Sequence, residues 1–417
     1  MATGERHYDV IIAGGGMIGT TTALALAPLG LSIAIVEPVP RTKPAQPSFD
    51  DRTTALSRSS QRMFSAMGLW PSIAAGATPI RRIHVSDKGR FGFSHIDAEQ
   101  QRVEALGYVV VNRVLGAVLQ EAMRASAGVD FICPARITAV ETAGDAVTVS
   151  VTAAGRESSI AGRHTCSLLV VADGARSEVR DMLGITSARK DYGQHAVVGN
   201  LRPALPMRNV AYERFTDSGP LALLPLGNDR AAFVWTVSAG EAGRVMDLDD
   251  RQFLAEFQDA FGYRAGELTR VGERAAYPLT LTRALRLTAV RSVLVGNAAH
   301  GLHPVAAQGF NLGLRDVAAL ADCIEERLTA DAHAGEIGSA ALLDNYVDWR
   351  RQDQRKLVGF TDGLVRLFEA PQPPVRLLRN LGMLGFDLVP GVREEFARHT
   401  MGLAGRLPRL SRGVPLR

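Results

Sequence analysis

A glycine turn near the start of the chain constrains the fold most. The apolar run 8–13, which precedes Gly14-Gly15-Gly16-Met17-Ile18-Gly19, is typical of a strand buried on both faces. Residues 17–29 then have helical character and stop at Pro28-Leu29-Gly30, and the segment 31–36 is again short and apolar. Strand, tight turn, helix and second strand in this order predict a βαβ unit of a parallel sheet.

Four residues of this unit suit the binding of a dinucleotide. Gly14 would permit the tight turn, Gly16 the approach of backbone to a pyrophosphate, and Gly19 the packing of helix on strand. Glu37 ends the second strand, where a carboxylate can accept hydrogen bonds from ribose hydroxyls. The helix N-terminus would turn unpaired N–H groups and its positive dipole end toward the phosphates. The alternative is a glycine-rich packing turn.

A second informative stretch runs from Arg291 to Asp316. It reads as a buried strand, a glycine-dense loop and the opening of a helix, whose later residues place apolar side chains on one face. With the first glycine turn, it predicts that two distant segments close around one cofactor. Between them, strand signals dominate 186–277, and residues beyond about 340 have a helical pattern.

Composition excludes several classes of protein. The net charge is +4, but only four of the 47 cationic residues are lysines and the arginines are spread along the chain, which argues against nucleic-acid binding. Three cysteines without C-x-x-C spacing predict neither disulfides nor a zinc site, and we expect no metal. The uncharged run 10–36 is broken by glycines and Pro28, so we expect no membrane-spanning helix and no signal peptide. A cytoplasmic location is expected.

Three motifs together carry a family resemblance. They are the glycine turn, the segment DGARSEVR from Asp173 to Arg180, and the segment VGNAAHGLHPVAAQGFNLGLRD from Val295 to Asp316. The chain resembles the single-component flavin aromatic hydroxylases related to para-hydroxybenzoate hydroxylase over nearly its whole length. Within them it is most similar to the ubiquinone-biosynthesis hydroxylases, in particular the 2-polyprenyl-6-methoxyphenol hydroxylase subgroup. The matching signature positions are His303, Pro304, Val305, Ala306, Gln308, Gly309, Asn311, Gly313 and Asp316.

The resemblance implies an α/β fold: a Rossmann-like FAD-binding domain with an inserted mixed β-sheet substrate domain and a helical C-terminal segment. The expected FAD-binding parts are 1–78, 105–185 and 278–340, the substrate parts are 79–104 and 186–277, and the helical C-terminal region is 341–417. After a proline-rich break at Pro371-Gln372-Pro373-Pro374, leucines recur at heptad spacing. Such a helix could pack on its own domain, dock on a membrane surface or bind another quinone-biosynthesis protein.

The resemblance also implies a set of cofactor-binding residues. These are Gly14, Gly16, Gly19, Glu37, Arg52, Arg113, Asp173, Gly296, Asn297, Pro304, Ala307, Gln308, Gly309 and Asn311. For Asp173 the alternative is a cap on the helix that follows, and for Arg52 and Arg113 it is surface solvation. Two positions depart from the family pattern: Ala307 stands where the signature has glycine, and Asn297 where the wider family has an acid.

The function implied is hydroxylation of the aromatic ring of a polyprenylated phenol in ubiquinone biosynthesis through a flavin C4a-hydroperoxide. FAD is the expected cofactor, NAD(P)H or another reductant the electron donor, and O₂ the co-substrate. The reactive centre would be the flavin, so no catalytic side chain is assigned. Apolar candidates for the substrate wall are Phe215, Leu223, Pro225 and Trp235, for which plain core packing is the alternative. The alternatives in function are a flavin reductase and a flavin-bound scaffold without catalysis.

Overall fold

The computed structural model describes residues 5–40, 52–89, 93–153, 162–227, 229–301, 308–330, 336–369 and 390–416. Its first sheet has the order β17 (Thr288–Ala289), β18 (Ser292–Leu294), β11 (Gly162–Val171), β1 (Arg6–Ala13), β2 (Ile33–Val36) and β8 (Val129–Ile132). From β18 to β8 all pairs are parallel. The antiparallel strands β9 (Ala135–Ala143) and β10 (Ala146–Ala153) attach to β11. The predicted βαβ unit is thus confirmed.

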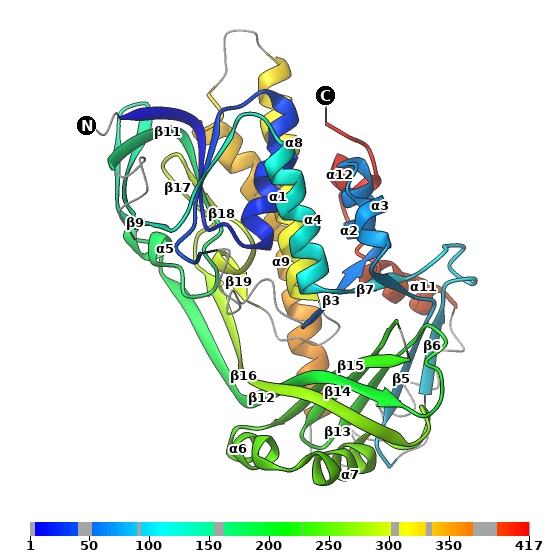
Figure 1. The fold of residues 1–417 in the computed structure, drawn as a ribbon. Helices are drawn as coiled ribbons and strands as arrows, with labels where there is room; N and C mark the ends of the chain where they lie inside the picture. The colour runs from blue at the N-terminus through cyan, green and yellow to red at the C-terminus, as the bar shows by residue number, and fades with distance from the viewer. Residues whose placement is uncertain are drawn as a thin grey trace.

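Long helices pack against this sheet. They are α1 (Met17–Leu26), α4 (Asn112–Ala125), α8 (Gln308–Ala330) and α9 (Ala340–Glu369), which Figure 1 shows running side by side in the centre of the molecule. Apolar residues of β1, α1 and α8 form one buried cluster, since Ile12, Ala23 and Leu314 all have no exposed surface. The predicted first helix ends earlier than expected. Pro28 falls in a 3-10 turn, η1 (Ala27–Leu29), and Gly30 follows with a φ of 74°.

A second sheet lies apart from the first, at the bottom of Figure 1. Its order is β19 (His300–Gly301), β16 (Leu268–Ala284), β12 (Ser187–Pro203), β15 (Arg230–Ser238), β14 (Gly219–Leu226), β13 (Val210–Thr216), β5 (Arg82–Asp87) and β6 (Phe93–Asp97). Only the β13–β5 pair is parallel, so the sheet is mixed, as predicted. The long strands β12 and β16 carry the chain between the two sheets (Figure 1).

Two helices cover one face of the second sheet, α6 (Ala239–Asp247) and α7 (Asp250–Phe261). The strand-dominated prediction for 186–277 missed both. Asp249 caps α7 through a reciprocal capping box with Gln252. Phe253 and Phe257 then recur at a four-residue spacing and pack edge to face on Trp235 of β15. These rings form the centre of a core between α7 and the sheet.

A small third sheet connects the two larger ones. Its strands are β3 (Thr53–Ser57), β7 (Gly107–Val111) and β4 (Ala77–Ile80), followed or flanked by α2 (Arg58–Ala66) and α3 (Trp70–Ala74). Ile80 and Val109 pack with Ala211, Leu226 and Ala232 of the second sheet. The face of the second sheet that α7 does not cover is therefore the one turned toward β3 and β7.

The described C-terminal part packs on its own molecule. Ala397 of α11 (Pro390–Thr400) is buried beside Ile96 and Leu106. At the start of α12 (Arg409–Arg412), the Arg409 guanidinium lies 2.9 Å from Glu325 of α8. The predicted heptad leucines lie outside the described residues. Across the described part of the chain, no helix is long and apolar enough to cross a bilayer, and no cluster of side chains could hold a metal ion.

Candidate functional site

The site begins at the glycine turn, where side chains have no room. Gly14 has a φ of 98°, and a Cβ there would lie 2.7 Å from the carbonyl oxygen of Ala172. A Cβ on Gly19 would lie 1.9 Å from the carbonyl oxygen of Gly14. Gly16 is the N-cap of α1 and supplies no side-chain cap, and the first turn of α1 holds no acidic residue. The N–H groups of Gly14 and Gly15 are used by Val36 and Glu37, but the N–H groups at the N-terminus of α1 have no intrahelical acceptor and suit an anionic ligand.

Glu37 lies directly beside this turn, at the end of β2. Its carboxylate accepts hydrogen bonds from the backbone N–H of Gly15 at 2.6 Å and of Val39 at 2.8 Å. The side chain is 6% exposed. These two bonds fix its orientation, and each carboxylate oxygen retains a lone pair for a ribose hydroxyl.

Asp173 follows β11, the strand beside β1 in the sheet. One carboxylate oxygen accepts a hydrogen bond from the backbone N–H of Val179 at 3.2 Å, near the start of α5 (Glu178–Met182), whose N-cap is Ser177. The helix-capping alternative thus accounts for one oxygen. The other, Oδ1, is buried with no hydrogen-bond partner among the described residues, and burial raises the pKa of the carboxyl group. Such an atom is open to a ligand donor.

The second predicted segment meets the glycine turn directly. Gly296 follows β18 in the short 3-10 helix η2 (Gly296–Ala298), and its φ is 60°. A Cβ on Gly313 of α8 would lie 2.8 Å from Ile18 and 3.1 Å from Gly296. Three chain segments therefore approach within van der Waals contact at one place. Asn297 is exposed there, so its amide is free to face a ligand.

Behind this contact lies a buried ionic network centred on Asp316. The carboxylate accepts hydrogen bonds from His300 Nε2 at 2.5 Å, Arg350 Nε at 2.8 Å and the backbone N–H of Gly296 at 3.1 Å. Burial alone would raise its pKa, but the charges of His300 and Arg350 outweigh burial and lower the pKa to about 2. The network ties the loop after β18 to α8 and α9.

Asn311 has an internal role that the sequence did not reveal. Its side-chain oxygen accepts hydrogen bonds from Ser57 N and Ser60 Oγ, each at 2.8 Å, and its amide donates to the carbonyl oxygen of Ala55 at 2.8 Å. It therefore joins the start of α8 to β3 and α2. Its side-chain oxygen and amide are thus engaged within the protein.

The two predicted arginines lie in different settings. Arg52 immediately precedes β3, and its guanidinium lies 4.8 Å from the ring centroid of Tyr277 in the second sheet. Arg113 is exposed in the first turn of α4. Gln308 and Gly309 open α8, and no atom would obstruct a Cβ on Gly309. Pro304 and Ala307 lie outside the described residues.

The four candidates for the substrate wall lie on two faces of the second sheet. Leu223 and Trp235 are buried in the core beneath α7, and alternation along β14 places Pro225 on the same face as Leu223. These three side chains point away from the face that β3 and β7 cover. The alternative of plain core packing fits these three residues, because α6 and α7 cover that face. Phe215 is on the other face, because alternation along β13 puts it with Ala211, which packs against Val109 of β7.

A residue that the sequence analysis did not single out lies between Ala211 and Phe215. Glu213 pairs in register with Ala222 and with Val85, so apolar side chains flank it on the face toward β7. It has no hydrogen-bond or ion-pair partner among the described residues, and part of its surface stays accessible. Burial nevertheless raises the pKa of its carboxyl group to about 7. A carboxyl group with a perturbed pKa on this face is a candidate for a functional role.

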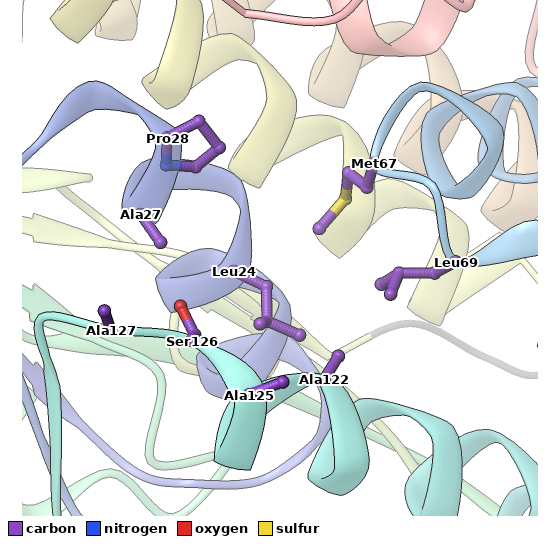
Figure 2. A pocket seen from close by; sticks show the side chains of 9 residues that line it. All are labelled: Leu24, Ala27, Pro28, Met67, Leu69, Ala122, Ala125, Ser126 and Ala127. Atoms are coloured by element: carbon purple, nitrogen blue, oxygen red, sulfur yellow. The ribbon is translucent and has the colours of Figure 1, made fainter.

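A separate groove of about 470 Å³ lies at the far end of α1, and Figure 2 shows the side chains that line it. Leu24, Ala27 and Pro28 line it from α1 and η1, and Ala122 and Ala125 from α4. Because the glycine turn is at the opposite end of α1, this groove is not part of the site.

The described residues fit FAD. The N-terminus of α1 has no side-chain cap and no acidic residue, Glu37 is positioned beside the glycine turn, and the buried Asp173 Oδ1 has no partner among the residues described. A Rossmann-like sheet joined to a mixed sheet across such a site defines the class of FAD-dependent aromatic-ring monooxygenases. The family model for the FAD binding domain matches residues 7–361.

Full-length relatives narrow the class. Ubiquinone hydroxylase UbiL of Rhodospirillum rubrum is 37% identical over 417 residues, which cover 99% of this chain and 94% of that protein. The 3-demethoxyubiquinol 3-hydroxylase of Escherichia coli is 30% identical over 96% of this chain and 100% of its own. The chain belongs to the FAD binding domain family and, within it, to the family of ubiquinone hydroxylases.

The fold also matches solved structures. That of p-nitrophenol 4-monooxygenase PnpA from Pseudomonas putida has a TM-score of 0.79 at 19% identity and covers 97% of this chain and 100% of that chain. At this identity the likeness concerns the fold alone, and it agrees with the α/β architecture predicted from the sequence.

Proposed function

We propose that this chain hydroxylates the aromatic ring of a polyprenylated phenol in ubiquinone biosynthesis, with NAD(P)H or another reductant and O₂ as co-substrates. The observation that carries the proposal is the full-length similarity to ubiquinone hydroxylases. Bound and reduced FAD supplies dioxygen activation and the transfer of one oxygen atom to an electron-rich ring. The protein's own residues must hold the cofactor, orient the ring and exclude water.

We assign the nucleotide end of FAD to the turn at Gly14, Gly16 and Gly19 and to Glu37. The backbone donors of the turn suit the pyrophosphate, and the carboxylate suits the ribose hydroxyls. Arg52 and Arg113 would add cationic donors. Asp173, Gly296, Asn297 and the start of α8 would surround the remainder of the cofactor, with Pro304, Ala307, Gln308, Gly309 and Asn311 as the predicted loop contacts.

We assign the substrate chamber to the face of the second sheet turned toward β3 and β7. Phe215 supplies apolar surface there, and Glu213 is its titratable group. A phenol hydroxyl beside the Glu213 carboxylate can donate its proton to it, which makes the ring more electron-rich. The apolar surroundings exclude water from the reacting ring. The proposal also includes a prenyl chain on the substrate and the division of the chain into the six predicted segments. It further includes a cytoplasmic location, with peripheral contacts to a membrane or to partner proteins through the C-terminal helices.

The test uses the purified full-length protein loaded with FAD. With a short-chain prenylphenol, the proposal expects faster flavin reduction by NAD(P)H and a hydroxylated product that carries one atom of labelled O₂. Complementation of strains that each lack one ring-hydroxylation step then identifies the carbon attacked. FAD reduction and oxidation without any ring product would support the flavin reductase instead, and bound flavin without turnover would support the scaffold.

A further inference from the structure

A second cavity, of about 450 Å³, lies on the side of the buried Asp316 network where α9 passes the end of β16. One wall is the segment 283–288, and the other is a stripe of α9. The α9 side chains are Asp344, Val347, Arg351, Gln354 and Arg355, whose spacing places them on one helix face. The volume is in the usual range for small-molecule sites.

The charge around this cavity is strongly one-sided. Arg283, Arg286, Arg351 and Arg355 line it, against the single acid Asp344. Arg286 donates to the carbonyl oxygen of Gly184 at 3.3 Å. The other three arginines have no ion pair or hydrogen bond with any residue in the described ranges. A partly enclosed space with several free guanidinium groups concentrates positive potential and suits an anion.

The interior of the cavity adds a polar atom without a partner. His300 lines it and is only 2% exposed. Its Nε2 is committed to Asp316, whereas its Nδ1 has no hydrogen-bond partner among the residues that the structure covers. A buried polar atom of this kind is normally satisfied by a ligand or a water. Gln354, which donates to Asp316 at 3.3 Å, lies on the same wall.

The cavity is also partly apolar. Ala284, Leu287 and Val347 contribute to its lining, and Leu285 at its edge is 65% exposed. The backbone of this wall is held in place, because Ala284 N donates to Ala299 O at 2.9 Å and Leu294 N donates to Leu287 O at 2.8 Å. Aliphatic surface bordered by guanidinium groups matches a ligand with an apolar body and one anionic head.

We propose that this cavity is a binding site for a small amphipathic anion, a carboxylate, sulfonate or phosphate ester, distinct from the sites assigned to FAD and the phenol. The anionic head contacts Arg283 and Arg351, and the apolar body contacts Leu287 and Val347. The Asp316 carboxylate accepts hydrogen bonds from His300 and from the backbone N–H of Gly296. A ligand that contacts His300 therefore contacts a side chain that supports the loop after β18.

The test measures binding of naphthalene-1-sulfonate to the FAD-loaded protein by isothermal titration calorimetry, with uncharged naphthalene-1-methanol as the ligand control. The double variant Arg283→Ala/Arg351→Ala should weaken sulfonate binding by about tenfold or more, since each guanidinium supplies a charge-assisted contact. The matched control Arg251→Ala/Arg270→Ala removes the same charge from exposed positions elsewhere and should leave the affinity unchanged. FAD content, read from absorbance, checks that both variants fold.

Three results would overturn the proposal. They are unchanged sulfonate affinity in the Arg283→Ala/Arg351→Ala variant, an equal loss in the control variant, and binding of the uncharged alcohol as tight as that of the sulfonate. If the double variant loses FAD, the single variant Arg351→Glu, on the exposed face of α9, takes its place and should also weaken sulfonate binding. The readout is binding, so failure here leaves the proposed hydroxylation untouched.

A second arm identifies the natural source of the anion. Sedimentation with phosphatidylglycerol vesicles, against phosphatidylcholine vesicles, compares parent and double variant. If the double variant loses both vesicle binding and sulfonate binding, the result supports the site with a lipid headgroup as its ligand. Loss of sulfonate binding alone supports the site with a soluble metabolite as its ligand.

Discussion

Burial holds the carboxyl group of Glu213 at a pKa of about 7, on a sheet face lined by alanine and valine. If its carboxylate receives the phenol proton, kcat/KM for hydroxylation should rise with pH through about 7 and then level off. Glu213→Gln should remove this rise and lower the plateau by about 10²-fold. Initial rates over a pH series measure both, with Glu273→Gln, exposed on β16, as the control. An unaltered pH profile in Glu213→Gln would contradict the assignment.

The same carboxyl group predicts a pH dependence of stability that needs no turnover. Its folded pKa of about 7 lies above the ordinary 4.5, so folding favours the protonated form. The parent therefore loses stability relative to Glu213→Gln as pH rises from 4.5 through about 7. Thermal unfolding should give equal Tm values at about pH 4 and a higher Tm for the variant at about pH 8. A Tm difference that does not change with pH would show that Glu213 is not enclosed.

The substitution Gly19→Ala tests whether the glycine turn holds the cofactor. A Cβ in Gly19→Ala would lie 1.9 Å from the Gly14 carbonyl oxygen, so β1 and α1 must separate and the phosphate donors move. We expect purified Gly19→Ala to retain little FAD by absorbance. Gly243→Ala is the control because nothing lies within 4 Å of a Cβ there, and an alanine inside α6 should stabilise by about 0.5–1 kcal/mol. Full FAD occupancy in Gly19→Ala would show that the turn does not hold the cofactor.

At this scale, the sequence predicted the residues whose roles are local. Gly14 and Gly19 could be identified because a strand, a turn and a helix follow one another within one short segment. Glu213 could not, because the apolar residues that flank it, Val85 and Ala222, come from β5 and β14. Asn311 matched a signature, but the signature did not show that its side chain is used by Ser57 and Ala55.

At the scale of elements, one helix that the sequence analysis did not predict decides which side chains of β14 and β15 belong to the core. The segment 221–226 is apolar on both faces, so periodicity alone did not determine which face meets α7. The capping pair Asp249 and Gln252, with Phe253, Phe257 and Phe261 at four-residue spacing, was a usable helix signal. Recognising α7 would have put Leu223 and Trp235 in the core.

The junction of α8 and α9 depends on an arginine with no exposed surface. Arg350 donates to Asp316 at 2.8 Å and to Asp353 at 2.6 Å. Arg350→Ala removes a positive charge that balances the buried carboxylate of Asp316. The variant should therefore lower the free energy of unfolding by about 3–5 kcal/mol. Urea unfolding measures it, with Gln352→Ala on the exposed face of α9 as the control. If the free energy of unfolding falls no further in Arg350→Ala than in Gln352→Ala, the ion pair of Arg350 and Asp316 contributes no net stability.

At the scale of the whole molecule, function depends on how three sheets meet. β3 and β7 cover one face of the second sheet, and Arg52 reaches from the start of β3 to Tyr277 on β16. The proposed chamber therefore requires contacts between segments more than a hundred residues apart. Motifs predicted that the two ends of the cofactor site converge, and Gly296 and Gly313 do meet Ile18. The wall of the proposed chamber carries no motif.

The two faces of the second sheet give the last prediction. Phe215→Ala removes a ring from the face toward β7 and opens the chamber to water, so less of the NAD(P)H consumed should yield hydroxylated product and more should yield hydrogen peroxide. Leu223→Ala removes a side chain of the opposite face, beneath α7. Both should lower the free energy of unfolding by about 2–5 kcal/mol, but only Phe215→Ala should uncouple turnover. Product and peroxide measured in the same reaction separate the two effects. Equal uncoupling in both variants, or uncoupling in Leu223→Ala alone, would show that the chamber is not on the face toward β7.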